Sequence, residues 1–180
     1  MVVYSSMPGQ GQNVFYQLAN GDIPSKTVYE DDNVRGILDT HPARKGHVLL
    51  LPKKQIQVSP QMDEETARSM SEAVKTMSER ALKAFDIGGT SIFIANGGVA
   101  GQKAPHLLVH LIPRKEQDNV GLRPKPKKIP KKEYEEVKNR LLSALGQDKQ
   151  RSKPREDSSD PHTSSGSDDV DFEKIERMFR

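Results

Sequence analysis

The sequence predicts an α+β fold in which helices pack on an antiparallel sheet. Strand-like and helix-like patterns alternate along residues 13–114, in the order hairpin, strand, long helix, strand, strand. Hydrophobic residues make up 33% of the 180-residue chain. They concentrate in residues 13–114, so this stretch can bury a core whereas much of the remainder cannot offset the entropy cost of ordering.

Three strands are expected in the first half of this domain. Residues 27–29 and 34–39 flank Asp31-Asp32-Asn33, a turn-forming sequence, and so predict a hairpin. Residues 47–51 form a continuous apolar run closed by Pro52, which is typical of a buried strand.

A long amphipathic helix and two further strands follow. Ser59 is a candidate N-cap, with Pro60 at the first helical position, and Gly88-Gly89 ends the pattern. Residues 91–95 and 107–112 predict strands. The apolar residues that repeat at helical spacing are Met70, Ala73, Val74, Met77, Ala81 and Phe85.

The remainder of the chain divides by composition. We expect a flexible N-terminus at 1–12, a basic connector and short helix at 115–145, a disordered linker at 146–169 and a short amphipathic helix at 170–180. Residues 146–169 contain no hydrophobic residue, whereas Phe172, Ile175 and Phe179 fall at helical spacing. That last segment could dock on a partner or on its own domain, or could keep only residual helicity.

Composition also excludes several classes of protein. The formal net charge is +3 and there is no cysteine, so disulfides, thiol nucleophiles and cysteine-ligated metals are excluded. No apolar run approaches the roughly 18–20 residues of a membrane helix, and the start lacks a secretory signal pattern. We therefore expect a soluble cytoplasmic protein without a membrane partner.

The basic run at 123–132 carries six positive charges and no acid. It could follow a nucleic-acid backbone electrostatically, but it has no aromatic residue for base stacking. We favour a solvated, proline-stiffened connector over a nucleic-acid site.

The residues that could carry chemistry lie near 96–112. A period of two places His106, Leu108 and His110 on one face of the predicted strand. The preceding glycine-rich turn, 96–102, can bring backbone N–H groups close to an anion. Taken alone, a histidine pair on a strand is more often structural, and such a turn is usually only a turn.

Together, these segments resemble the histidine triad (HIT) superfamily. The resemblance rests on Gly21-Asp-Ile-Pro-Ser25, Val28-Tyr-Glu-Asp-Asp32, Gly46-His-Val-Leu-Leu-Leu-Pro-Lys53 and Asn96…Gly101-Gln102…His106…His110-Leu-Ile-Pro-Arg114. It covers about residues 13–114 and is nearest to the branch of small dimeric nucleotide-binding proteins and their archaeal and bacterial relatives. The resemblance implies a purine nucleotide site in a cleft on the sheet, and a homodimer.

The family motif contains three histidines, of which the middle one attacks phosphorus and forms a covalent nucleotidyl-histidine. His106 matches the first histidine and His110 the third, whereas the middle position is Leu108. A leucine side chain has no lone pair, so it cannot attack phosphorus. The resemblance therefore implies a degenerate catalytic site that still binds phosphate.

Other positions match by the same resemblance. Asp39 matches the acid that holds the ribose hydroxyls, and His47 matches a further active-site histidine. Lys103 stands where several relatives carry a small hydroxyl residue, and contact with phosphate or with solvent alone is about equally expected. The positions that match phosphate contacts are Asn96, Gly101 and Gln102.

Some relatives hold a structural zinc ion with two cysteines and a histidine. The matching positions here are Asn13, Tyr16 and Gln55, which are poor zinc ligands. We predict no metal and no cofactor.

We expect a purine-nucleotide-binding HIT-family protein with weak or absent nucleotidyl hydrolase activity. One alternative is an active nucleotide hydrolase or transferase that uses His106 or His110. A second alternative is an interaction protein that uses the basic segment and the C-terminal helix.

Overall fold

The computed structural model describes residues 13–121 and 127–145. They belong to two compact units, one within residues 1–123 and the other within 124–180. The segments expected at 1–12, 146–169 and 170–180, and part of the basic run, lie outside the described residues.

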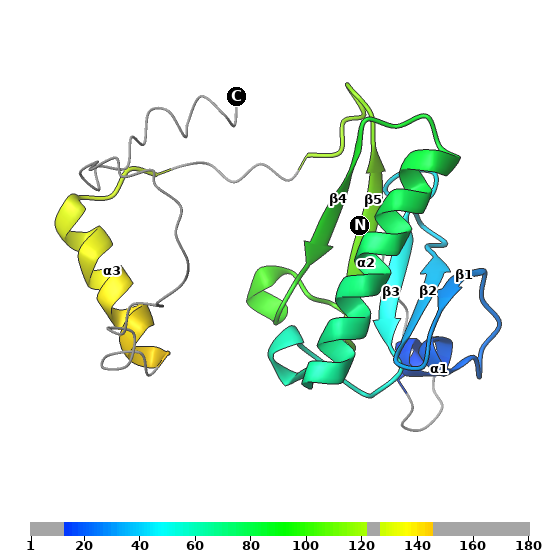
Figure 1. Cartoon of the computed structure of the whole chain (residues 1–180), viewed down its shortest axis with the longest axis horizontal. Coiled ribbons are helices and arrows are strands. Elements are labelled where there is room, and N and C mark those ends of the chain that lie inside the picture. Colours follow the sequence, from blue (N-terminus) through cyan, green and yellow to red (C-terminus); the bar gives the residue numbers. More distant parts are fainter. Residues whose placement is uncertain (1–12, 122–126, 146–180) are drawn as a thin grey trace, which may run out of the picture. The chain divides into compact units, whose positions relative to one another are not determined.

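The first unit is built on a five-stranded sheet in the order β1-β2-β3-β5-β4 (Figure 1). Every neighbouring pair is antiparallel, which confirms the predicted α+β class. The hairpin turns at Asp31, whose Oδ1 accepts the N–H groups of Asn33 and Val34. The strands are β1 (Thr27–Glu30), β2 (Val34–Leu38), β3 (Val48–Pro52), β4 (Gly89–Ile94) and β5 (Val109–Arg114).

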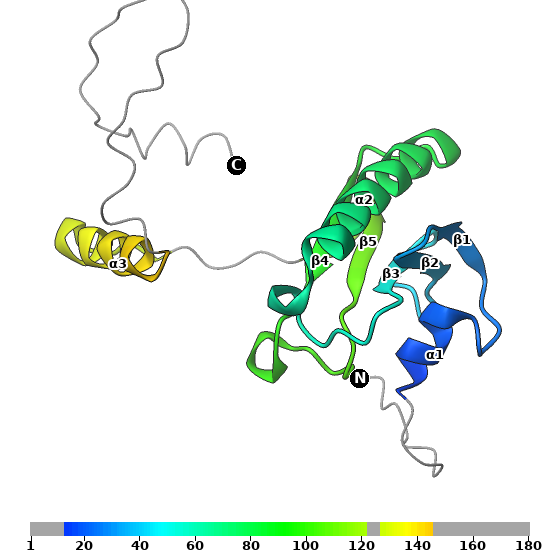
Figure 2. The same cartoon turned by 60° about the horizontal axis from the view of Figure 1, so that its bottom comes forward.

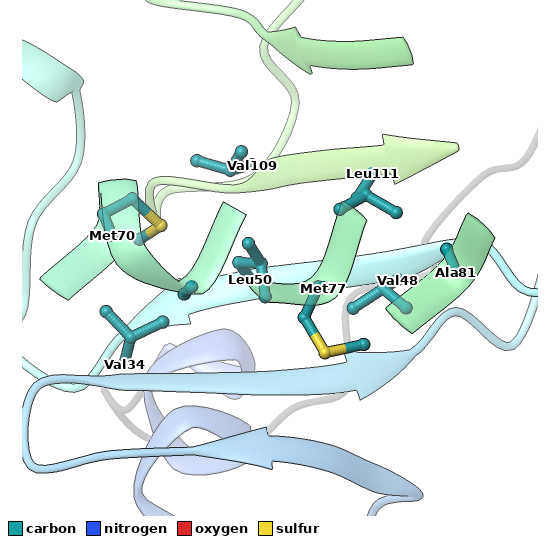
Figure 3. Close-up of a cluster of buried hydrophobic side chains, with 9 residues drawn as sticks. Val34, Val48, Leu50, Met70, Met77, Ala81, Val109 and Leu111 are labelled. Carbon is teal, nitrogen blue, oxygen red and sulfur yellow. The ribbon is translucent and has the colours of Figure 1, made fainter. Parts of the chain in front are cut away.

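Helix α2 (Glu64–Ala84) packs on one face of this sheet, as Figure 1 shows. The apolar residues at three- and four-residue spacing point inward and meet every second residue of the central strands. Figure 3 shows the resulting cluster, in which Leu50 lies between Met70 and Met77. Its buried members are Val34, Val48, Leu50, Met70, Ala73, Met77, Ala81, Val109 and Leu111.

The predicted start of this helix was wrong. Ser59 and Pro60 open only a short 3-10 turn, Ser59–Gln61, and α2 begins at Glu64. Asp63 is the N-cap, because its Oδ1 accepts the N–H of Thr66 at 2.8 Å. The acidic side chains of Glu64 and Glu65 in the first turn also stabilise the helix, because they lie near the positive end of its dipole.

A short helix that the sequence pattern did not predict, α1 (Val14–Asn20), covers part of the opposite face (Figure 2). Asn13 caps its start and Gly21, with φ at +83°, ends it. The helix packs on a second apolar cluster whose buried members are Ala19, Ile37, Leu49 and Leu51. The sheet therefore has α2 on one face and α1 on the other.

Strand β5 begins two residues later than expected, at Val109. Leu107 has left the ladder, since its N–H donates to the carbonyl of Ile56 at 2.8 Å. The alternation still holds, because Val109 packs on the α2 side whereas Leu108 packs on the α1-side cluster.

The second unit contains one described helix, α3 (Lys131–Ala144), close to the expected 133–145. None of its residues is buried, and its large apolar side chains are between 37% and 61% exposed. Among the described residues, no helix is long and apolar enough to cross a membrane. The exposed apolar residues of α3 and its end are Tyr134, Val137, Leu141, Leu142 and Leu145.

Candidate functional site

His47 is held by the backbone around it, at the entry to β3. It follows Gly46, whose φ of +87° is the left-handed conformation that favours glycine. The His47 carbonyl accepts the N–H of Asp39 at 3.0 Å, so the residues that leave β2 and enter β3 face each other. The side chain of His47 is only 5% exposed.

His47 and His110 contact each other directly. Nε2 of His47 lies 3.1 Å from Nδ1 of His110, and the two ring centroids are 5.2 Å apart. The pairing of β3 with β5 brings them together, because Leu49 lies opposite His110 in the register. Phe93, opposite His110 on β4, flanks the second ring at 5.9 Å. The pair therefore lies on the sheet face opposite α2.

The other ring nitrogen of His47 has two neighbours. The backbone N–H of Ala43 points at Nδ1 from 3.2 Å, and Oδ2 of Asp39 lies 3.3 Å from the same atom, which either neighbour can engage according to the tautomer. Oδ1 of Asp39 is occupied by the N–H of His41 at 2.9 Å. Asp39, His47 and His110 thus form one continuous polar chain.

Burial keeps the imidazoles of His47 and His110 neutral at pH 7. Desolvation lowers the pKa of His47 below its ordinary value, although nearby Asp39 acts in the opposite direction. The pKa of His110 is lowered mainly by burial and further by its neighbour His47, again against Asp39. Neutral imidazoles can accept protons and can hydrogen-bond through either nitrogen.

His106 lies in a different environment from Asp39, His47 and His110. Its side chain is fully buried, and its Nε2 lies 3.0 Å from the carbonyl of Pro52. Because a carbonyl only accepts, this nitrogen must carry the proton. Burial lowers the pKa of His106, and Tyr16 of α1 meets the ring edge-on. The structure therefore gives His106 no solvent-facing reactive nitrogen.

Leu108 lies between the two histidines in sequence and packs with apolar neighbours. It is partly buried and contacts the cluster formed by Ile37, Leu49 and Leu51 together with α1. This position thus supplies packing and no polar group.

The glycine-rich turn is fixed by the amide of Gln102. Its Oε1 accepts the N–H of Gly97, and its Nε2 donates to the carbonyls of Gln57, Ala104 and His106. Oδ1 of Asn96 accepts the N–H and the hydroxyl of Ser59. Both side chains therefore order this turn.

Backbone conformation gives the same turn an open surface. Gly97 and Gly101 have φ near +90°, and nothing lies within 4 Å of where a side chain would stand at either position. Lys103 is exposed beside them. The turn could therefore present backbone N–H groups and one cation to an anion.

Asp39, His47 and His110 are also residue types that bind metals, and one donor atom from each lies within 4.8 Å of the others. In this structure the two rings hydrogen-bond to each other, and Oδ2 of Asp39 lies 3.3 Å from Nδ1 of His47. At the positions matched to zinc ligands, Asn13 donates to the carbonyl of Pro105 at 2.6 Å, and Gln55 is exposed. The absence of a metal stays a prediction.

Comparison with known proteins decides the family. The model of the HIT domain matches residues 20–117. The chain belongs to the HIT domain family. This confirms the resemblance and, together with the sheet topology, the expected fold.

Relatives in the HIT family cover the globular part of the chain. An uncharacterised HIT-like protein of Methanocaldococcus jannaschii is 40% identical over 105 residues, 58% of this chain and 81% of the relative. The adenylylsulfatase HINT3 of Arabidopsis thaliana is 34% identical over 109 residues, 61% of this chain but only 55% of the plant protein.

A solved structure extends the likeness. A hypothetical histidine triad nucleotide-binding protein of Sulfolobus tokodaii strain7 is 32% identical, with a TM-score of 0.55. The match covers 73% of this chain and 89% of that structure.

Proposed function

We propose that this HIT protein binds a purine nucleotide on the α1 face of the sheet and hydrolyses nucleotidyl bonds weakly or not at all. The observation that carries the proposal is the packing of Leu108, which stands at the nucleophile's position. An apolar side chain there removes covalent catalysis without disturbing the polar groups around it.

The binding residues are proposed from the resemblance. Asp39 would hold the ribose hydroxyls, and the turn at Asn96, Gly101 and Gln102 would hold the phosphate, with Lys103 available as a cation. Since Asn96 and Gln102 hydrogen-bond within the protein, we expect the backbone N–H groups that they position to make the phosphate contacts. The names of the plant and archaeal relatives support a nucleotide or an adenylyl compound as ligand.

If catalysis survives, His110 is better placed than His106 to carry it. The buried ring of His106 donates to the Pro52 carbonyl. His110 is half-buried, and within residues 13–121 and 127–145 its ring hydrogen-bonds through Nδ1 alone. Any surviving acid–base or nucleophilic chemistry is therefore assigned to Nε2 of His110.

The homodimer is a proposal supported by an edge strand that no described residue covers. Strand β4 ends the sheet, and its Ile92 and Ile94 are 42% and 38% exposed. Leu82 on the neighbouring helix α2 is 47% exposed. An unpaired strand edge bordered by apolar side chains is suited to pairing with a second copy. Sedimentation equilibrium of the full chain would test this arrangement.

A second candidate function is interaction through α3, favoured by the exposed apolar side chains on that helix. A helix of 14 residues is marginal on its own in water, so a covering partner would stabilise it. Leu141→Lys should abolish such an interaction and leave nucleotide affinity unchanged.

Calorimetric titration of the full chain with AMP, adenosine and CMP tests the main proposal. We expect AMP to bind more tightly than the other two, and Asp39→Asn to weaken its binding at least tenfold. The matched control is Asp32→Asn, an exposed acid in the hairpin turn. Turnover of adenosine phosphoramidate or adenylylsulfate in the ordinary range of about 1–10³ s⁻¹ would refute the catalytic part.

A further inference from the structure

Nδ1 of His47 has two neighbours that require opposite protonation states. The N–H of Ala43, at 3.2 Å, can donate only to a nitrogen without a proton. The carboxylate of Asp39, at 3.3 Å, can accept only from a nitrogen that carries one. A neutral imidazole has a single N–H, so His47 satisfies one of the two neighbours at a time.

This choice is transmitted to His110. When Nδ1 of His47 carries the proton, its Nε2 is bare and accepts the Nδ1 proton of His110, so Nε2 of His110 is bare as well. When Nδ1 of His47 is bare, its Nε2–H donates to Nδ1 of His110 instead, and the proton of His110 must lie on Nε2. The two rings therefore change tautomer together.

Nε2 of His110 is the end of the Asp39–His47–His110 series that faces away from Asp39. It has no hydrogen-bond partner among the described residues, and it is not one of the buried atoms left without a partner. It therefore reaches solvent, on the α1 face of the sheet where Leu108 lies. In one tautomer this atom is a proton acceptor, and in the other it is a donor to an anion.

We propose that Asp39 sets the proton position on His110 through His47. One part of this inference, the binding of ribose hydroxyls at Asp39, rests on the proposed function. In the free protein the charged acceptor holds the proton on Nδ1 of His47, so Nε2 of His110 is bare. When ribose hydroxyls donate to Asp39, the carboxylate no longer needs the proton of His47. Nδ1 of His47 then becomes bare and accepts the N–H of Ala43, and His110 presents an N–H toward the phosphate.

The protons balance in this exchange. The proton between the rings moves from Nδ1 of His110 to Nε2 of His47. The Nδ1 proton of His47 leaves to water by way of Asp39, and Nε2 of His110 takes a proton from water. Both rings remain neutral, so the bound state gains a hydrogen-bond donor for the phosphate without a change in net charge.

Nitrogen NMR of the full chain labelled with ¹⁵N-histidine tests the proposal, because protonated and bare ring nitrogens have well-separated shifts. His47→Gln and His110→Gln assign the signals, and His106 is an internal reference because its Nε2 must donate to Pro52. We expect bare Nε2 atoms on His47 and His110 in the free protein, and protonated Nε2 atoms on both after saturation with AMP.

Asp39→Ala leaves the Ala43 N–H as the partner of Nδ1, so both rings should adopt the AMP-bound tautomers without nucleotide. Asp39→Asn, which retains an acceptor for the His41 N–H, should do the same, whereas Asp32→Asn should not. Unchanged tautomers in both Asp39 variants, or in the AMP complex, would overturn the proposal. If AMP does not bind, the proposed function and its coupling to the tautomers both fail, and the Asp39 variants still decide the link from Asp39 to His110.

Discussion

A side chain at Gly46 would collide with the ring of Phe85, the residue that ends α2. A Cβ at this position would lie 2.7 Å from Cε2 of Phe85 and 3.2 Å from the ring of Pro113. The φ of +87° adds backbone strain for any other residue. Gly46 thus sets how closely the backbone that carries His47 approaches the end of the long helix.

Gly46→Ala should therefore lower the free energy of unfolding by about 1–3 kcal/mol. The substitution should also displace His47 from His110, since Gly46 directly precedes His47 in the sequence. Chemical denaturation and histidine NMR measure the two effects. Gly88→Ala is the control, because nothing lies within 4 Å of its Cβ position and it should change stability little. Equal stability of the two variants would contradict the packing argument.

Lowering the pH should destabilise the fold through His47 and His110. Both have a pKa below the ordinary 6.5 in the folded state, so the unfolded chain binds more protons below that pH. Their contribution is full above about pH 6.5 and is lost as the pH falls through the folded pKa values. Thermal melts between pH 8 and 5 should show this decline.

His110→Gln should flatten that decline, since the variant lacks one of the titrating rings. His41→Gln, which changes an exposed histidine outside the pair, should retain it. A decline of the same steepness in the wild type and in His110→Gln would exclude His110 as a cause.

The local patterns of this fold could be predicted from the sequence, whereas its long-range contacts could not. The spacing of Met70, Met77 and Ala81 predicted the buried face of α2, and alternation assigned Leu108 to the face opposite Val109. Asn13 and Gly21 are sequence signals for the helix that was missed, but seven residues are too few for a clear period. Asp63 was hidden by the stronger capping pattern of Ser59-Pro60.

The site shows the same division. Its residues were named from the resemblance, but the contact of His47 with His110 joins positions 63 apart and depends on the β3–β5 register. The approach of Ala43 to Nδ1 depends on the loop between β2 and β3, and the pairing of Phe93 with His110 depends on the β4–β5 register. None of these contacts has a local sequence signal.

Leu108→His should place an imidazole at the position that the HIT resemblance assigns to the nucleophile. Because Leu108 packs on the apolar cluster beneath α1, we expect a loss of about 1–3 kcal/mol of stability. The regained nucleophile should form an acid-labile nucleotidyl adduct that mass spectrometry detects. Leu108→Asn is the matched control, polar but unable to form the adduct. A folded, nucleotide-binding Leu108→His variant without adduct or turnover would show that the site lacks more than one residue.

Truncation after Leu145 should leave the melting temperature nearly unchanged. Residues 146–169 contain no hydrophobic residue that could add buried apolar surface. Calorimetry of the full and shortened chains measures the difference. A drop of several degrees, on the order of 1 kcal/mol for a domain of this size, would instead indicate that residues 170–180 pack on the remaining chain.

The four hydrogen bonds of Gln102 make the glycine-rich turn sensitive to chemical ageing. One N–H and three carbonyl groups surround this amide, so it must keep one oxygen and one nitrogen in a fixed orientation. Deamidation to glutamate changes the side chain by hardly more than one atom, yet it would set a carboxylate oxygen against three carbonyl oxygens. The turn would open and carry a negative charge at the place proposed for phosphate. A preparation that has aged in this way would lose nucleotide affinity while its sheet and long helix remained folded.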